Sequence, residues 1–215
     1  ILGTGQLSLA KFLFITADDN NKLSTHNISE YLHFIMQRIN LARDVHFYTN
    51  TSIDTLDYSG TGLNTGSKVV LAAYGAIIRE LGTEVPQALK ELTGFFNPRL
   101  VMPGVLVLQT GAFKNYETAQ LEMKMLDDQL KHHIELLQSF PFIIIADDAA
   151  FVTENIRNFL WVTFTRCNPS HDIYGIDAFV TYKHWGCNGS MVIDARIKPH
   201  HAPPVEKNPA VEKKI

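Results

Sequence analysis

Cysteine is scarce in this sequence, and Cys167 and Cys187 are too few to form a disulfide framework. We therefore expect a reduced, cytoplasmic setting. No apolar run approaches the roughly 20 residues that a membrane-spanning helix needs, so we predict no membrane span. An excess of one charge is also missing, because 19 basic residues stand against 22 acidic ones. The basic surface typical of nucleic-acid-binding proteins is therefore not expected.

The beginning of the chain lacks the features of a targeting segment. It starts at Ile1, with neither a charged stretch nor a small-residue cleavage site. We predict no signal peptide and expect the sequence to be part of a longer chain. The composition, 46% hydrophobic and 19% charged, is typical of a globular protein.

A strand-like run that ends in two acids occurs twice, as FLFITADD at 12–19 and FIIIADD at 142–148. The following segments, NISEYLHFIMQRINLARD at 27–44 and NIRNFLWVTFTRCNPSHD at 155–172, share Asn, Ile, an aromatic residue, Leu, Arg, Asn and Asp in the same order. Their apolar residues fall at helical spacing. Each copy then continues with an extended piece, a loop and a Gly-Ser pair before an apolar strand. Two copies of this length indicate a duplicated α/β unit rather than a solenoid.

The segment between the copies has a different pattern. Pro86 is suited to begin a short helix that reaches about Thr93, and FFNPRLVMPG then reads as a loop. The run at 105–110 predicts a buried strand, and apolar residues spaced by three or four predict a long helix at 116–138. Together with the strand at 142–148 this is a βαβ crossover, which implies parallel pairing.

These patterns predict an α/β fold with a mixed, largely parallel sheet flanked by helices and built from two related strand-helix-strand units. We expect a single domain over 1–198, with repeat one at 11–82, a connecting βαβ segment at 83–139 and repeat two at 140–198. The Pro-rich and charged residues 199–215 predict an extended C-terminal tail. Ser24 or Thr25 in the first copy and Thr153 in the second are predicted helix caps.

The paired acids allow two interpretations. Asp18–Asp19 and Asp147–Asp148 follow strands, where open α/β sheets place ligands, and such pairs bind Mg²⁺ in phosphoryl-transfer sites. Acids in a strand-to-helix turn also cap the helix and complement its positive end. We favour capping and predict no metal at either pair.

Other candidate sites carry weaker signals. Asp128 and His132 lie four residues apart on one face of the long predicted helix and could share a metal, although a solvated helix face is the simpler interpretation. His200 and His201 lie in the predicted tail, and Cys167 has no base near it in the sequence. The sequence motifs alone therefore indicate no catalytic residue.

An ordered series of motifs resembles the C-terminal domain of the UbiD-like decarboxylases, the 3-polyprenyl-4-hydroxybenzoate carboxy-lyase family. The first copy carries the series from Asp18–Asp19 through Arg38, Arg43–Asp44, NTSIDTLD at 50–57 and Gly66-Ser67-Lys68. The second copy carries a fainter version, with Arg166, Pro169, Asp172, Gly189–Ser190 and Asp194–Ala195. It departs from the family pattern in lacking the lysine and in having His171 where the family has arginine.

The resemblance implies an enzyme that uses prenylated flavin mononucleotide and a divalent metal to decarboxylate an aromatic or unsaturated acid. In the family, the catalytic and flavin-binding residues belong to the region preceding this domain, so neither cofactor is expected in this chain. The terminal domain is implied to support homo-oligomer assembly and to line the substrate cleft through one loop. The residues that this resemblance assigns to the cleft are Asn50, Thr51, Leu56, Asp57 and Lys68.

Two alternatives stay open at this point. The loop at 50–66 could be a plain surface connection. The whole chain could also be an independent α/β binding or signalling module whose Asp pairs hold Mg²⁺ or phosphate.

Overall fold

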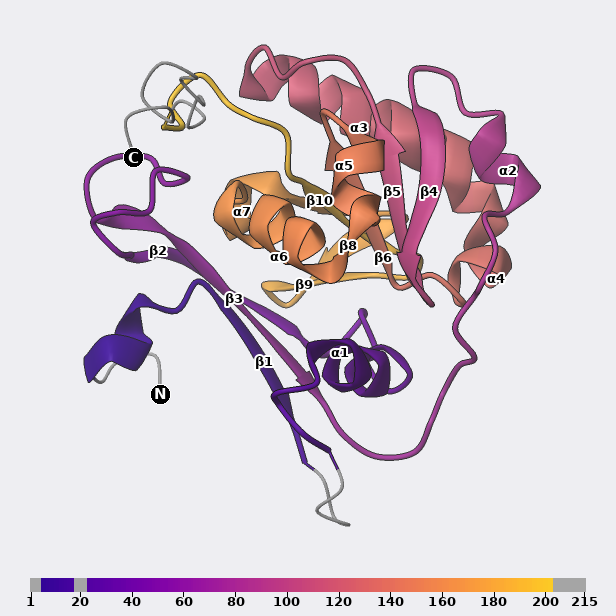
Figure 1. The fold of residues 1–215 in the computed structure, drawn as a ribbon, viewed down its shortest axis with the longest axis horizontal. Helices are drawn as coiled ribbons and strands as arrows, with labels where there is room; N and C mark the ends of the chain where they lie inside the picture. Colours follow the sequence, from indigo (N-terminus) through magenta and orange to yellow (C-terminus); the bar gives the residue numbers. More distant parts are fainter. Residues whose placement is uncertain (1–4, 18–22, 203–215) are drawn as a thin grey trace, which may run out of the picture.

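The computed structural model describes residues 5–17 and 23–202, which form three β-sheets with helices packed around them (Figure 1). A 3-10 helix, η1 (Gly5–Leu9), precedes the first strand. The predicted Asp18–Asp19 turn and residues 203–215 of the predicted tail lie outside the described residues. Within the described part, none of the helices has the length and apolar character that crossing a bilayer requires.

The first sheet comes from the first predicted copy. Its strands are β1 (Phe12–Thr16), β2 (Val45–Ser52) and β3 (Thr65–Ala73). Strand β3 lies in the middle, parallel to β1 and antiparallel to β2. Helix α1 (Ile28–Met36) connects β1 to β2 and packs against the sheet. We call residues 12–73 the first unit.

The second predicted copy has the same strand order. Its strands β6 (Phe142–Ala146), β7 (Ile173–Gly175) and β10 (Met191–Asp194) belong to the five-stranded sheet. Strand β10 lies between the other two, parallel to β6 and antiparallel to β7. The third strand thus occupies the central position in both copies. We call residues 142–194 the second unit.

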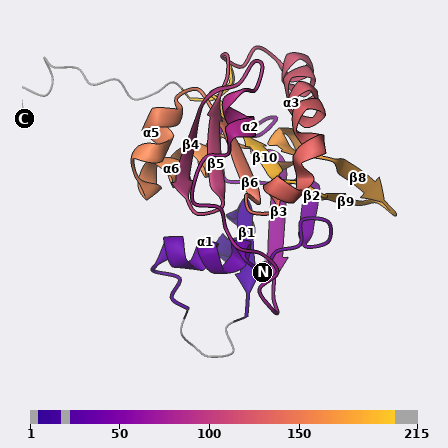
Figure 2. The same ribbon diagram turned by 90° about the vertical axis from the view of Figure 1, so that its right-hand side faces the viewer.

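Helices and one hairpin complete the second unit. Helices α5 (Ala149–Glu154), α6 (Ile156–Thr165) and the one-turn α7 (Pro169–Asp172) connect β6 to β7. Strands β8 (Ala178–Thr181) and β9 (His184–Cys187) form a hairpin between β7 and β10. This hairpin, which projects from the body in Figure 2, stands where the sequence predicted an irregular loop.

Asparagines cap the equivalent helices of the two units. Asn27 accepts a backbone N–H at the start of α1, and Asn155 does so at the start of α6. The predicted caps Ser24, Thr25 and Thr153 were therefore wrong. Each asparagine directly precedes the first helical residue and holds its side-chain oxygen near the N–H three residues later, which is the geometry that a cap requires.

Each unit also contains a tight turn closed by an aspartate. The Asp44 carboxylate accepts the N–H of Asn40 at 2.9 Å, and the Asp172 carboxylate accepts the N–H of Asn168 at 2.6 Å. In both turns the backbone N–H of the aspartate also donates to the carbonyl of the asparagine. The matching residues in the sequence therefore make matching hydrogen bonds.

The two units pack against each other through these turns. Ser67 of the first unit donates to the Asn168 side chain at 2.5 Å and accepts the N–H of Ser170 at 2.8 Å. In the opposite direction, the N–H of Cys187 in the second unit donates to the carbonyl of Leu41 at 3.2 Å. In each unit, a residue in or close to the Gly-Ser pair, Ser67 or Cys187, therefore contacts the Asn-to-Asp turn of the other unit.

The connecting segment contains the predicted crossover. Strand β5 (Val105–Gln109) pairs in parallel with β6, and α3 (Tyr116–Leu130) lies between them in the sequence. The predicted helix at 116–138 continues beyond α3 as a 3-10 turn, η2 (Lys131–His133), and a last helical turn, α4 (Ile134–Leu137). The prediction of a βαβ unit with parallel pairing is confirmed.

The segment FFNPRLVMPG, predicted as a loop, instead forms strand β4 (Phe96–Met102). It pairs antiparallel with β5 at the edge of the five-stranded sheet. The pairing shifts register between Phe96 and Arg99, and Pro98 lies within that shift. A proline is tolerated there because an edge strand has a free side and an irregular step needs fewer ladder hydrogen bonds.

Alternate residues of the central strands of the five-stranded sheet point to opposite faces. Both faces are apolar, and both are covered. Helices α2 (Gln87–Lys90), α3 and α4 cover one face. Helices α1, α5 and α6 and the first sheet share a core with the other face (Figure 2). The residues of the central strands that face this shared core are Val105, Val107, Phe142, Ile144, Ala146, Met191 and Ile193.

The α/β class and the mixed character of the sheets are confirmed, but parallel pairing does not dominate. Of the described strand pairs, β1–β3, β5–β6 and β6–β10 are parallel. The pairs β2–β3, β4–β5, β7–β10 and β8–β9 are antiparallel. The described strands also divide into three sheets rather than one, and β4 and the β8–β9 hairpin add antiparallel pairs that the sequence did not predict.

A group of charged side chains lies buried behind β10. Arg196 donates to both oxygens of Asp194, at 2.9 and 2.7 Å, and neither side chain is exposed. Arg196 also forms an ion pair with Glu122 of α3 at 2.7 Å. The bidentate pair with Asp194 balances the buried charge of Arg196. The ion pair between Arg196 and Glu122 connects the end of β10 to α3.

Replacing one partner of this pair should therefore destabilise the protein strongly. We expect Asp194→Ala to lower the free energy of unfolding by about 3–5 kcal/mol, because it removes the fully buried, bidentate partner of Arg196 and leaves only Glu122 to balance the charge. Urea unfolding followed by circular dichroism measures this loss. Asp128→Ala, which removes a carboxylate from an exposed helix face, should change the transition little, and equal effects of both substitutions would contradict the prediction.

Candidate functional site

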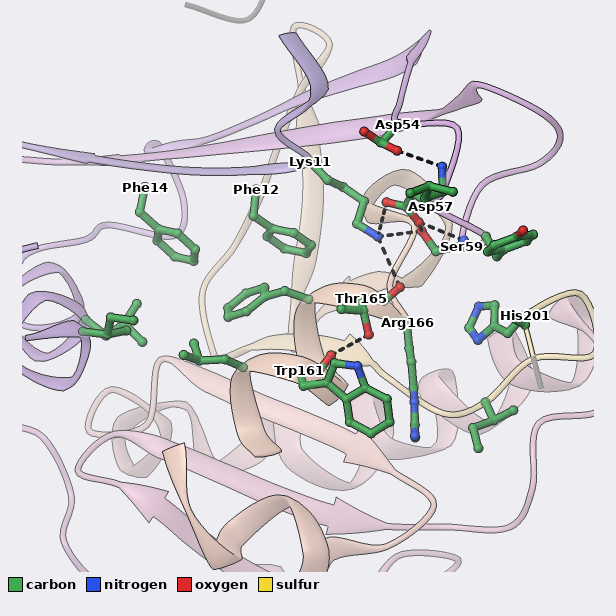
Figure 3. A pocket seen from close by; sticks show the side chains of 18 of the residues that line it. Lys11, Phe12, Phe14, Asp54, Asp57, Ser59, Trp161, Thr165, Arg166 and His201 are labelled. Carbon is green, nitrogen blue, oxygen red and sulfur yellow. Dashed lines mark hydrogen bonds and ion pairs between the residues drawn. The ribbon is translucent and has the colours of Figure 1, made fainter. Parts of the chain in front are cut away.

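A cavity of about 820 Å³ lies between the two units. Its walls come from β1, α1, the loop at 53–64, the end of α6 and the segment 195–202, which we call the C-terminal strap. Figure 3 shows aromatic side chains toward one end and charged or polar side chains toward the other. The cavity therefore depends on the pairing of the two units.

A buried lysine anchors the 53–64 loop to β1. The Nζ of Lys11 lies 2.8 Å from Asp57 Oδ2 and donates to Ser59 Oγ at 2.6 Å, and Ser59 Oγ donates to Asp57 Oδ1 at 2.6 Å (Figure 3). Lys11 also donates to the carbonyl of Thr165 at 3.4 Å, at the end of α6. This network ties the loop to both units.

Backbone turns within the loop fix its shape. The N–H of Leu56 donates to Asp54 and the N–H of Ser59 donates to Asp57, at 2.8 and 2.9 Å. A side chain at Gly60 would collide with the carbonyl of Thr65, so this close approach requires glycine. Held in this way, the loop leaves Leu56 80% exposed.

The structure separates the five residues that the resemblance assigned to a cleft. Leu56 and Asp57 line the cavity. Asn50 and Thr51 lie in β2 and do not line it, and Lys68 is buried in β3, where its Nζ donates to the carbonyl of Ser8. Burial lowers the pKa of Lys68. The assignment of these five residues to a substrate cleft stays a prediction.

The second acid pair is occupied by local contacts. Asp148 caps α5 by accepting the N–H of Phe151 at 3.0 Å, which confirms the capping interpretation for this residue. Asp147 accepts the N–H of Ile197 at 2.8 Å and forms an ion pair with Arg166 at 3.4 Å. The pair therefore connects the start of α5 with the strap and with the cavity wall.

The candidate metal pair, Asp128 of α3 and His132 of η2, lies on an exposed helical surface, in agreement with the simpler interpretation. Asp128 forms ion pairs with Lys124 at 3.0 Å and with Lys131 at 2.6 Å. The side chain of His132 makes no hydrogen bond or ion pair within the described structure. Because two lysines neutralise the carboxylate, a metal ion would have to displace them.

Sequence reasoning did not identify several residues of the cavity. Lys11 lies just before β1, Arg166 ends α6 and His201 belongs to the strap. The Arg166 guanidinium carbon lies 5.1 Å from the ring centroid of Trp161. For Arg166, the alignment with Arg38 in the two copies was a sequence signal. Lys11 and His201 had none, because they reach the cavity only through tertiary contacts.

His201 lines the cavity and closes a turn within the strap. Its Nδ1 accepts the N–H of Lys198 at 3.2 Å, and Lys198 is almost fully buried. Burial first, and then the positive charge of Lys198, lower the pKa of His201 to about 3. The imidazole is therefore neutral near pH 7.

Comparison with protein families identifies the first unit. Residues 1–73 match the family described as 3-octaprenyl-4-hydroxybenzoate carboxy-lyase C-terminal domain. These residues are therefore similar to a UbiD-like C-terminal domain, and the resemblance seen in the sequence is confirmed.

Similarity to curated relatives extends over the whole chain. It is 34% identical over 217 residues to a 4-hydroxybenzoate decarboxylase subunit of Chlamydia pneumoniae, an alignment that covers 100% of this chain and 34% of that protein. An uncharacterised protein of Chlamydia caviae is 32% identical over 215 residues, again with 100% and 34% covered. The chain thus spans about a third of the length of these relatives.

Two solved enzyme structures align with part of the chain at low similarity. Vanillic acid decarboxylase of Sedimentibacter hydroxybenzoicus aligns with 77% of this chain and 42% of its own, at 14% identity and a TM-score of 0.36. The enzyme HmfF of Pelotomaculum thermopropionicum, in an evolved dimeric form with prFMN, aligns with 77% and 40%, at 12% identity and a TM-score of 0.36.

The described residues do not fit the cofactors that the resemblance implies. No group of three or more His, Cys, Asp or Glu side chains within 5–17 and 23–202 is arranged to hold a metal ion. At the polar end of the cavity, Lys11 is already engaged by Asp57 and Ser59. Lys11 therefore has no donor left for a flavin phosphate, and the carboxylates of Asp54, Asp57 and Asp147 would repel its second negative charge. We derive no step through either group.

The neutral state of His201 predicts a pH dependence of stability. Its folded-state pKa of about 3 lies below the ordinary value of 6.5, so its stabilising contribution is present above pH 6.5 and is lost as the pH falls toward 3. We expect His201→Gln to flatten the decrease of the melting temperature between pH 6.5 and 4. His132→Gln, on the exposed helix face, is the control, and an unchanged slope in His201→Gln would contradict the prediction.

Proposed function

We propose that this chain is the C-terminal part of a UbiD-like carboxy-lyase that decarboxylates an aromatic or unsaturated acid. The observation that carries the proposal is the alignment of the whole chain with a third of a 4-hydroxybenzoate decarboxylase subunit, together with the family match of residues 1–73. We place prenylated FMN and the divalent metal in the preceding region, because the described residues do not fit them.

The role we propose for this chain is assembly and the formation of one wall of the substrate cleft. The 53–64 loop supports this role, because it is fixed from beneath by Lys11 and presents apolar side chains outward. Leu56 and Leu63 are 80% and 78% exposed on it. Exposed leucines on a rigid loop are suited to cover an apolar surface of a neighbouring region or a second copy.

No described contact favours the alternative of an independent module with metal-binding acid pairs. Asp148 is used as a helix cap, and Asp147 is engaged by a backbone N–H and by Arg166. Decarboxylation by the intact enzyme is therefore the activity to be tested.

A charge at the tip of the loop should impair the reaction of the intact enzyme. We expect Leu56→Glu to lower kcat/KM for decarboxylation at least about tenfold, because a carboxylate would repel an acid substrate and disrupt an apolar wall. Release of CO₂ from 4-hydroxybenzoate and cinnamate-like acids, with prenylated FMN and Mn²⁺ supplied, measures this effect.

Leu121→Glu is the matched control, because Leu121 is 69% exposed on α3, away from the loop. It should leave kcat/KM unchanged. Full activity of Leu56→Glu would remove the loop from the substrate cleft. Absence of decarboxylation by the intact wild-type enzyme would refute the proposed function itself.

A further inference from the structure

The apolar end of the cavity is a continuous aromatic wall (Figure 3). The ring centroid of Phe164 on α6 lies 4.8 Å from that of Phe12 and 5.7 Å from that of Phe14, both on β1 and both edge-on. Leu160 and Leu32 extend this wall from α6 and α1. The surface offers dispersion contacts to a long apolar group and no charge.

Arg166 is the cationic group of the cavity with donor capacity left. Among the described residues, its side chain forms one ion pair, with Asp147 at 3.4 Å, although a guanidinium has five N–H donors. Lys11, in contrast, donates to two side chains and one backbone carbonyl, which uses its three N–H groups. An anion entering the cavity would therefore bind at Arg166.

His201 also lines this cavity and has a ring nitrogen without a partner. Because its Nδ1 accepts the N–H of Lys198, the proton of the neutral ring lies on Nε2. This nitrogen is buried and has no hydrogen-bond partner among the described residues. A ligand oxygen that accepted from it would remove the cost of an unsatisfied buried donor.

The nearby acids limit the charge of the ligand. Asp54 and Asp57 line the cavity and Asp147 lies beside Arg166, so a second negative charge, as on a phosphate monoester, would be repelled. A carboxylate has one charge, and its two oxygens match the planar fork of a guanidinium. The volume of about 820 Å³ is large for a single aromatic ring.

We propose that this cavity binds an amphipathic monocarboxylate whose apolar body is much larger than one ring, as in a fatty acid of about 12 carbons. Its carboxylate accepts from Arg166 and His201, and its chain lies along Phe12, Phe14 and Phe164. The inference concerns binding alone and does not depend on the proposed decarboxylase function.

Calorimetric titration of the purified protein with dodecanoate, kept below its aggregation concentration, tests the proposal. We expect one site. Dodecanol should bind at least tenfold more weakly because it lacks the charge, and benzoate at least tenfold more weakly because it lacks the apolar area. No binding of dodecanoate, or equal affinity for dodecanol, would overturn the proposal.

Variants at the two ends separate the two kinds of contact. Arg166→Gln should weaken dodecanoate binding about tenfold and leave dodecanol unaffected, whereas Arg166→Lys should recover part of the loss. Arg157→Gln is the matched control, because Arg157 is an exposed arginine on the same helix. An equal loss in Arg157→Gln would show that the charge effect is not specific to the cavity.

A cavity-filling variant and a fluorescence readout guard against an unfolded Arg166→Gln protein. Leu160→Trp should abolish binding without changing the charge. In a Trp185→Phe background, Trp161 is the remaining tryptophan, and 2-bromododecanoate, with its bromine beside the carboxylate, should quench it. Full binding by Leu160→Trp, or no quenching of Trp161, would place the ligand elsewhere and overturn the proposal.

Discussion

A three-stranded sheet cannot bury its apolar face by itself, and the pairing of the first unit with the second is the constraint on which the rest of the structure depends. The shared core shows this directly, because Leu32 and Ile35 of α1 pack in one cluster with Phe142 and Ile144 of β6. Neither unit has enough helices to cover its own sheet. The interface between them is therefore also the interior of the protein.

The cavity follows from the same pairing. The Asn-x-x-x-Asp turns bring the units together on one side, through Ser67 with Asn168 and through Cys187 with Leu41. Elsewhere along the interface, large rings such as Phe12 and Phe164 meet edge-on and keep the backbones apart. Lys11 then joins the 53–64 loop to the end of α6. The hydrogen-bonded turns hold the units together at one side, the aromatic rings separate them at the other, and the cavity lies between.

The sequence predicted the elements whose signals are local. The duplicated strands and helices and the crossover through α3 were recognised because apolar periodicity and repeated motifs lie within short windows. Strand β4 was missed because Pro98 reads as a loop signal and only its neighbour β5 makes it a strand. The buried pair of Asp194 and Arg196 was missed because charged residues are usually exposed. Their burial depends on packing against α3, which the sequence does not show.

The residues of the candidate site also fall into those with a local sequence signal and those brought together by tertiary contacts. Asp57 and Leu56 were named through the family motifs, which are contiguous in the sequence. Lys11 meets Asp57 only when β1 and the 53–64 loop have folded together, and Arg166 joins them only when the second unit packs against the first. The two units also differ at the position between their last two strands. The first has the anchored loop with Leu56, and the second has the β8–β9 hairpin. The two units therefore share their strand order and the turns through which they pair, whereas the segment between the last two strands differs, and the loop that the motifs identify lies in the first unit.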